Sequence, residues 1–201
     1  METLLILAPT IAVISLTPGM CMTLAFSLGL TQGYRRTLWM MWGEMLGVAF
    51  VVSVTMLALT WLLALDPRFM QGLAVIGGCY LLYIAWRLWH ADDQFGADRY
   101  EGDISRKALA LLGFTTAIMN PKGWAFMLAL LPGFTDTSRP VLPQLGVFLA
   151  IMLTTEFLSM SLYASGGRQV RQLLGKDRNL SMLNRIAAVL MVAVSAFVRL
   201  S

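Results

Sequence analysis

The stretch LLILAPTIAVISLTPGMCMTLAFSLGL, from Leu4 to Leu30, is almost wholly apolar, but Thr17-Pro18-Gly19 interrupts it near its centre. A membrane-spanning helix needs about 20 residues, so this stretch is long enough to cross a bilayer. Proline removes a helical hydrogen-bond donor, and the glycine beside it loosens the turn. The stretch therefore predicts a membrane span that is broken near the middle of the bilayer.

Five more apolar runs follow, at Leu38–Leu65, Phe69–Trp89, Ala108–Phe134, Leu142–Ser165 and Met182–Leu200. They are too long and too uniformly apolar for the strands of a membrane barrel, which alternate over about ten residues, so they indicate helices. Of the 201 residues, 58% are hydrophobic and 13% are charged, whereas a soluble domain has roughly 25% charged residues. We predict one all-α, polytopic membrane domain of six transmembrane helices, with no soluble catalytic domain, no enzymatic activity and no cofactor.

The basic residues indicate an orientation, because cytoplasmic loops are enriched in Lys and Arg. The loops after the first, third and fifth runs hold eleven of them, and the alternate faces hold only Arg68, Arg139 and Arg199. This asymmetry predicts that both termini lie outside the cytoplasm. The eleven residues are Arg35, Arg36, Arg87, Arg99, Arg106, Lys107, Arg168, Arg171, Lys176, Arg178 and Arg185. They lie in loops between apolar runs, so the net charge of +4 does not suggest nucleic-acid binding.

The polar segment Ala91–Lys107 mixes both charge signs and reads as a solvated cytoplasmic linker. It divides the chain into half-repeats of about residues 1–90 and 106–201, with three spans each. Aromatic residues near the run ends are typical of anchors at the membrane interface. These anchors are Trp39, Trp42, Trp61, Trp86 and Trp89.

Three ionisable residues remain at membrane depth, namely Glu44, Lys122 and Glu156. A charge at the centre of a membrane helix costs about 2.5–3.5 kcal/mol on insertion scales, so such residues usually face the bundle interior and carry function. A structural ion pair is the alternative explanation. Glu44 lies closer to the cytoplasmic end of its span, and its side chain could instead reach the interface.

A second break, Asn120-Pro121-Lys122-Gly123, interrupts the fourth run. Each break lies in the first helix of its half, and Glu44 and Glu156 each lie in the second. Halves with three spans enter the membrane in opposite directions, so the pattern predicts a 3+3 inverted repeat with its substrate site near the midplane.

The breaks and charges suggest a chemistry. Half-helix N-termini attract carboxylates, and freed carbonyls attract ammonium groups or cations. We predict that Lys122 binds a substrate carboxylate and that Glu156 or Glu44 binds an amino group or a transported proton. Two carboxylates and one ammonium leave a negative charge that a proton would neutralise, which favours proton antiport.

Thr17-Pro18-Gly19, the spaced Gly29, Gly33, Gly43 and Gly47, and Asn120-Pro121-Lys122 together resemble the LysE/RhtB family of bacterial amino-acid exporters. The resemblance covers essentially the whole chain. It implies export of amino acids or close derivatives across the bacterial inner membrane, driven by protons. From the breaks and the buried charges, we predict a substrate site that includes Thr17, Pro18, Gly19, Asn120, Pro121, Lys122 and Glu156. The family's motifs do not separate lysine, threonine, homoserine, leucine and cysteine as substrates.

The chain departs from the family pattern at Met20, where a second proline is usual, and this predicts a less broken first helix. The glycine spacing permits close helix approach and is compatible with a homodimer. His90, at the inner end of the third run, reads as an interfacial residue rather than a proton relay.

Other functions stay open at this level. Glu44, Glu156 and Cys21 could serve a metal-cation exporter, although Lys122 would repel the cation and no C-x-x-C metal motif is present. Cys21 and Cys79, predicted as buried and inert thiols, could instead form a thiol-disulfide relay. A non-transporting assembly subunit is a third alternative. A hydrolase using Ser15, Ser159 or Ser161 with Lys122 would lack a membrane histidine.

Overall fold

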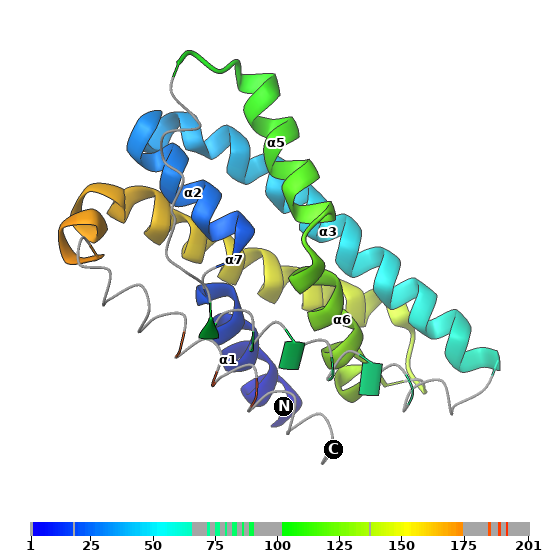
Figure 1. Ribbon diagram of the computed structural model, residues 1–201. Coiled ribbons are helices and arrows are strands. Elements are labelled where there is room, and N and C mark those ends of the chain that lie inside the picture. Colours follow the sequence, from blue (N-terminus) through cyan, green and yellow to red (C-terminus); the bar gives the residue numbers. More distant parts are fainter. Residues whose placement is uncertain are drawn as a thin grey trace.

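The computed structural model describes residues 2–17, 19–65, 102–136 and 138–174, and single positions between residues 72 and 90 and between 185 and 192. Every regular element in these ranges is a helix, as predicted (Figure 1). Two helices, over Tyr34–Trp61 and Val141–Gly166, are each long and apolar enough to cross a membrane alone. The elements are α1 (Glu2–Leu16), α2 (Met20–Thr31), α3 (Tyr34–Leu65), α5 (Arg106–Ile118), α6 (Pro121–Phe134) and α7 (Val141–Leu174).

The first predicted span is broken, as its sequence indicated. α1 ends at Leu16, α2 begins at Met20, and the two axes differ by 53°. Gly19 precedes α2 in an extended conformation, with φ −153° and ψ −176°. Met20 occupies the first position of α2, so the missing second proline does not restore a continuous helix. Pro18 lies outside the described residues.

The fourth predicted span is likewise two helices, α5 and α6. Asn120 caps α6, because its side-chain oxygen accepts a hydrogen bond from the Lys122 backbone N–H at 3.1 Å. Pro121 follows at the first helical position, where a proline costs no intrahelical hydrogen bond. The same short motif therefore ends one helix and starts the next.

The second and fifth predicted spans are the long helices α3 and α7. Both extend beyond the predicted runs, so Arg35, Arg36, Arg168 and Arg171 belong to helix ends rather than to loops. The third and sixth predicted spans fall mostly outside the described residues. The described positions within them are helical.

The described helices follow an inverted arrangement (Figure 1). The broken helix α1–α2 packs against α7, and the broken helix α5–α6 packs against α3. α1–α2 runs opposite to α5–α6, and α3 runs opposite to α7. Each broken helix thus lies against the second helix of the other half.

Glycines permit the closest of these approaches. A side chain on Gly43 or Gly113 would overlap backbone atoms across the α3–α5 contact, and one on Gly29 would overlap Ala164 of α7. Gly47 similarly faces Ala117. Gly33 differs, because it has open space around it and a φ of 77°, which identifies it as the turn between α2 and α3.

Two apolar cores lie on either side of a polar layer. One gathers side chains of α1, α6, the second half of α3 and the first half of α7, including Ile11 and Phe126. The other gathers side chains of α2, α5, the start of α3 and the later part of α7, including Leu28 and Met40. The polar layer between them is at the level of the two helix breaks, and this is where the candidate site lies.

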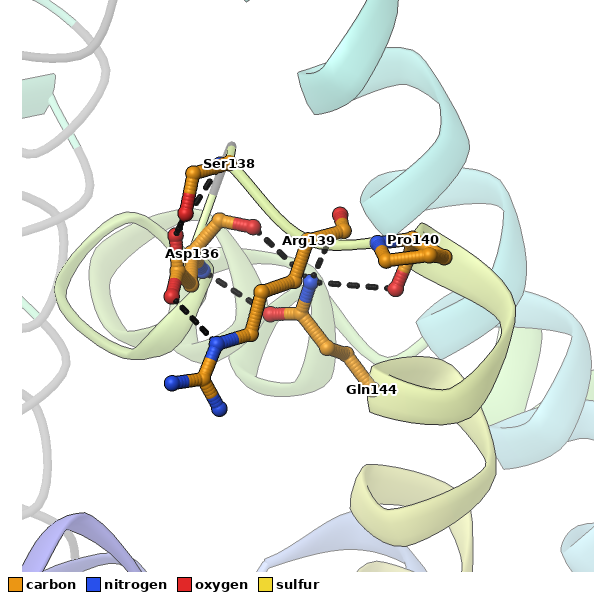
Figure 2. Close-up of polar contacts among 5 residues, drawn as sticks. All are labelled: Asp136, Ser138, Arg139, Pro140 and Gln144. Carbon is orange, nitrogen blue, oxygen red and sulfur yellow. Dashed lines mark hydrogen bonds and ion pairs between the residues drawn. The ribbon is translucent and has the colours of Figure 1, made fainter.

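The loop between α6 and α7 is held by its own polar groups (Figure 2). Asp136 accepts hydrogen bonds from the Ser138 hydroxyl at 2.6 Å and the Ser138 N–H at 2.9 Å, and pairs with Arg139 at 3.0 Å. These hydrogen bonds, and then the Arg139 charge, hold the pKa of Asp136 below its ordinary value. The Gln144 amide donates to the carbonyls of Asp136, Arg139 and Pro140, which ties the loop to α7.

Candidate functional site

Lys122 connects the two helix breaks. Its ammonium, in the first turn of α6, donates hydrogen bonds to the carbonyl oxygens of Ile14 at 3.1 Å and Thr17 at 2.9 Å. These carbonyls belong to the end of α1, where the helix dipole is negative and favours a cation. Lys122, which lies at the break of the fourth predicted span, therefore binds the backbone at the break of the first predicted span.

Two other predicted residues complete this contact. The Asn120 amide donates to the Cys21 sulfur in the first turn of α2, at 3.6 Å. A side chain on Gly19 would lie 3.3 Å from the Lys122 ammonium, so glycine leaves room for it. The structure therefore brings Thr17, Gly19, Asn120 and Lys122 together.

Glu44 of α3 and Glu156 of α7 lie buried beside this junction. Their side chains belong to residues that are 0% and 8% exposed, and each carboxylate acts electrostatically on the other. The alternative in which Glu44 reaches the interface does not hold, because its side chain is buried in the bundle. Both Glu44 carboxylate oxygens lack a hydrogen-bond partner among the described residues.

The structural ion pair considered as the alternative explanation is not formed between Lys122 and a carboxylate of the described residues. Lys122 interacts electrostatically with Glu156, but no Lys122–carboxylate pair within 4.0 Å occurs in the described part of the chain. The ion pairs seen there, Arg36–Asp103 and Arg139–Asp136, lie at the two ends of the bundle. The lysine and both carboxylates therefore border a common space instead of neutralising one another directly.

That space is a cavity of about 50 Å³ lined by residues of α1, α2, α3, α5, α6 and α7. A buried water needs about 10–15 Å³, so a few small atoms can be held there. Six polar side chains line it, together with apolar side chains from α3, α6 and α7. The polar ones are Ser15, Cys21, Glu44, Asn120, Lys122 and Glu156.

Three residues of this region were missed by the sequence-based prediction of the site. The Tyr163 hydroxyl donates to the Leu16 carbonyl at 3.0 Å, and the Trp124 indole donates to the Ile118 carbonyl at 2.7 Å. Each satisfies a carbonyl at the last residue of a helix ending at a break. Ser15, considered only as a nucleophile, lies beside Glu156. A tyrosine within an apolar run was a usable signal, because buried hydroxyls need partners.

The predictions for Pro121, the two cysteines and His90 have different outcomes. Pro121 begins α6 and has an exposed side chain, so its contribution is to the backbone. Cys21 is buried, but Cys79 is exposed, so the expectation of two buried thiols is wrong for Cys79. Both are free cysteines, with no disulfide between them. The His90 ring lies against Trp86 and its backbone, on an exposed position.

The geometry of the cavity also bears on two alternative functions, a metal-cation exporter and a hydrolase. Glu44, Glu156 and Cys21 line one cavity, yet no group of three metal-ligating side chains is arranged to hold an ion in the described ranges. The Lys122 ammonium is bound to two carbonyl oxygens rather than to a serine hydroxyl, which does not favour a Ser-Lys hydrolase.

Comparison with known proteins adds the family. The family model described as LysE type translocator matches residues 12–201. A protein from Vibrio cholerae serotype O1 (strain ATCC 39315 / El Tor Inaba N16961), described as an uncharacterized membrane protein, is 25% identical over 177 residues. That match covers 88% of this chain and 86% of the Vibrio protein. No solved structure matches the chain significantly.

Proposed function

Because the chain belongs to the LysE type translocator family, and is therefore a multi-pass membrane transporter, we propose that it exports amino acids or close derivatives by proton antiport. The observation that carries the proposal is the junction of the two breaks. There one lysine and two carboxylates border a single cavity between two apolar cores. A small zwitterion needs partners of both charge signs, and lipid supplies none.

In the proposed mechanism, the Lys122 ammonium and the N-terminus of α6 bind the substrate carboxylate. Glu156 binds the amino group. Lys122 then exchanges part of its bonding to the carbonyls of Ile14 and Thr17 for the substrate. Thr17, Pro18, Gly19, Asn120 and Pro121 shape this site through their backbone. The exchange links substrate binding to the end of α1.

Glu44 is the proposed proton site. Its carboxylate is fully buried and has no hydrogen-bond partner among the described residues, so a negative charge there is poorly compensated. Without substrate, one ammonium and two carboxylates leave a net negative charge, which a proton on Glu44 would neutralise. Antiport requires the proton and the substrate to occupy the site alternately, so we propose that the substrate's amino group competes with that proton for the two carboxylates.

We also propose that the protein lies in the bacterial inner membrane with both termini outside. The starts of α3 and α5 and the end of α7 lie at one end of the bundle, and the α6–α7 loop lies at the other (Figure 1). The first end carries Arg35, Arg36, Arg106 and Lys107, as a cytoplasmic face would. Labelling of a single cysteine at Ser138 by an impermeant reagent from outside would test this.

The test of function is efflux of labelled amino acids from loaded vesicles, with wild type compared with Lys122→Ala and Glu156→Gln at matched expression. We expect gradient-dependent efflux in wild type and at least a tenfold loss in both variants. If folded wild type exports no amino acid, the proposal fails. Transport of an inorganic cation would then favour the alternative of a cation exporter.

A further inference from the structure

The cavity is polar at one end and apolar at the other. On α3, Val48 and Val52 follow Glu44 at intervals of one helical turn, and on α6, Phe126 follows Lys122 by one turn. On α7, the corresponding residue precedes the carboxylate: Met152 lies one turn before Glu156.

All these apolar residues lie on the same side of the polar layer, because α3 and α6 run in one direction and α7 in the other (Figure 1). That side faces the α6–α7 loop. Phe126, Val52 and Met152 belong to the same apolar core and are 1%, 0% and 7% exposed. The cavity therefore has two parts. We call the end at the helix breaks, lined by Glu44, Lys122 and Glu156, the charged floor. We call the part beyond it, lined by Val48, Val52, Phe126 and Met152, the aliphatic wall.

We propose that the substrate is a small neutral amino acid with an aliphatic side chain, of the size of alanine or valine. This inference rests on the proposed function and specifies its substrate. The α-carboxylate and α-amino groups lie at the charged floor, against Lys122 and Glu156. The side chain lies against Val48, Val52 and Met152, with Phe126 limiting its length.

A basic amino acid does not fit this arrangement. Its side-chain ammonium would extend several ångströms from the α-carbon, into the aliphatic wall. No ionisable residue lines the cavity there, because Glu44 and Glu156 are neighbours at the charged floor. An ammonium buried without a partner is strongly disfavoured. An acidic side chain is disfavoured for the same reason.

A large side chain is disfavoured by the packing at the apolar end of the cavity. Phe126 lines that end, is 1% exposed and is fixed among tightly packed neighbours. Close-packed cores resist the displacement of such a ring. We therefore expect phenylalanine and tryptophan to be poor substrates.

The test is counterflow in vesicles containing the purified full-length protein. Labelled alanine is used outside, and unlabelled alanine, valine, lysine, arginine, glutamate or phenylalanine is loaded inside. Alanine and valine should drive uptake at least tenfold faster than the charged and aromatic amino acids. Fastest counterflow with lysine or arginine would overturn the substrate inference but leave amino-acid transport standing. Efflux assays with each labelled amino acid in turn detect failure of the proposed function itself, which would appear as no transport of any of them.

Phe126→Ala adds a test of the wall, and Phe50→Ala is its matched control. Phe50 lies on α3 with 48% of its surface exposed, outside the cavity lining. Phe126→Ala should raise transport of phenylalanine relative to alanine at least tenfold, and Phe50→Ala should leave the ratio unchanged. An unchanged ratio in folded Phe126→Ala would overturn the role of Phe126. If that variant does not fold, the wild-type panel decides the substrate class.

Discussion

The Lys122 ammonium lies 2.9 Å from the Thr17 carbonyl oxygen, so a side chain of one broken helix caps the broken end of the other. The two residues are 105 positions apart in the sequence. Lys122, the candidate substrate-binding residue, therefore also supplies hydrogen bonds to the backbone at the end of α1. The contact also predicts that changes to Lys122 affect folding and transport together.

Replacing Lys122 by methionine should cost about 1–3 kcal/mol of stability, because buried carbonyls of Ile14 and Thr17 lose their donor. Arginine should restore charge but not transport, since its wider planar fork differs from the compact ammonium held beside Gly19. Thermal unfolding in detergent and amino-acid efflux measure the two effects. Wild-type efflux by Lys122→Arg would show that only the charge matters.

Tyr163→Phe should lower stability by about 1 kcal/mol, because the Leu16 carbonyl loses a hydrogen bond of 3.0 Å. Tyr34→Phe is the matched control, since the Tyr34 hydroxyl donates a hydrogen bond to the Ser161 hydroxyl at an exposed site. The melting temperatures of the two purified variants provide the comparison. Equal melting temperatures would mean that Tyr163 does not support the end of α1.

Gly43→Ala should greatly reduce the amount of folded protein, because the added methyl group would overlap the Ala110 backbone. Gly146→Ala should be neutral or stabilising by up to about 1 kcal/mol, since open space surrounds Gly146 and alanine favours a helix. Size-exclusion profiles and melting temperatures distinguish them. Normal folding of Gly43→Ala would contradict the close packing of α3 on α5.

The sequence was sufficient to predict the helical class, the two breaks and their common location. These features depend on local chemistry, such as the Asn120-Pro121 cap and the Thr17-Gly19 interruption. It left open whether Glu44 turns inward or reaches the interface, because that depends on the rotation of α3, which contacts α5 closely at Gly43 and Gly47. Nor could it predict that Lys122 binds carbonyls rather than carboxylates, which depends on how four separate spans meet.

The loop between α6 and α7 should respond to acid. The folded-state pKa of Asp136 lies below its ordinary value, so its stabilising contribution is present above the unfolded value, about 3.9, and is lost as pH falls through the folded-state pKa. Asp136→Asn should therefore melt slightly below wild type at pH 7. The difference should shrink as pH falls below the unfolded value of about 3.9. A difference that is constant from pH 7 to pH 3 would contradict the depressed pKa.

We propose that the cavity between the two breaks couples amino-acid export to protons through Glu44. The most direct test compares wild type, Glu44→Gln and Glu44→Asp in vesicles, measuring efflux driven by an imposed pH gradient and amino-acid exchange without a gradient. We expect Glu44→Gln to lose gradient-driven efflux at least tenfold and to retain exchange, whereas Glu44→Asp keeps part of both. Gradient-driven efflux by Glu44→Gln at the wild-type rate would show that Glu44 does not couple transport to protons.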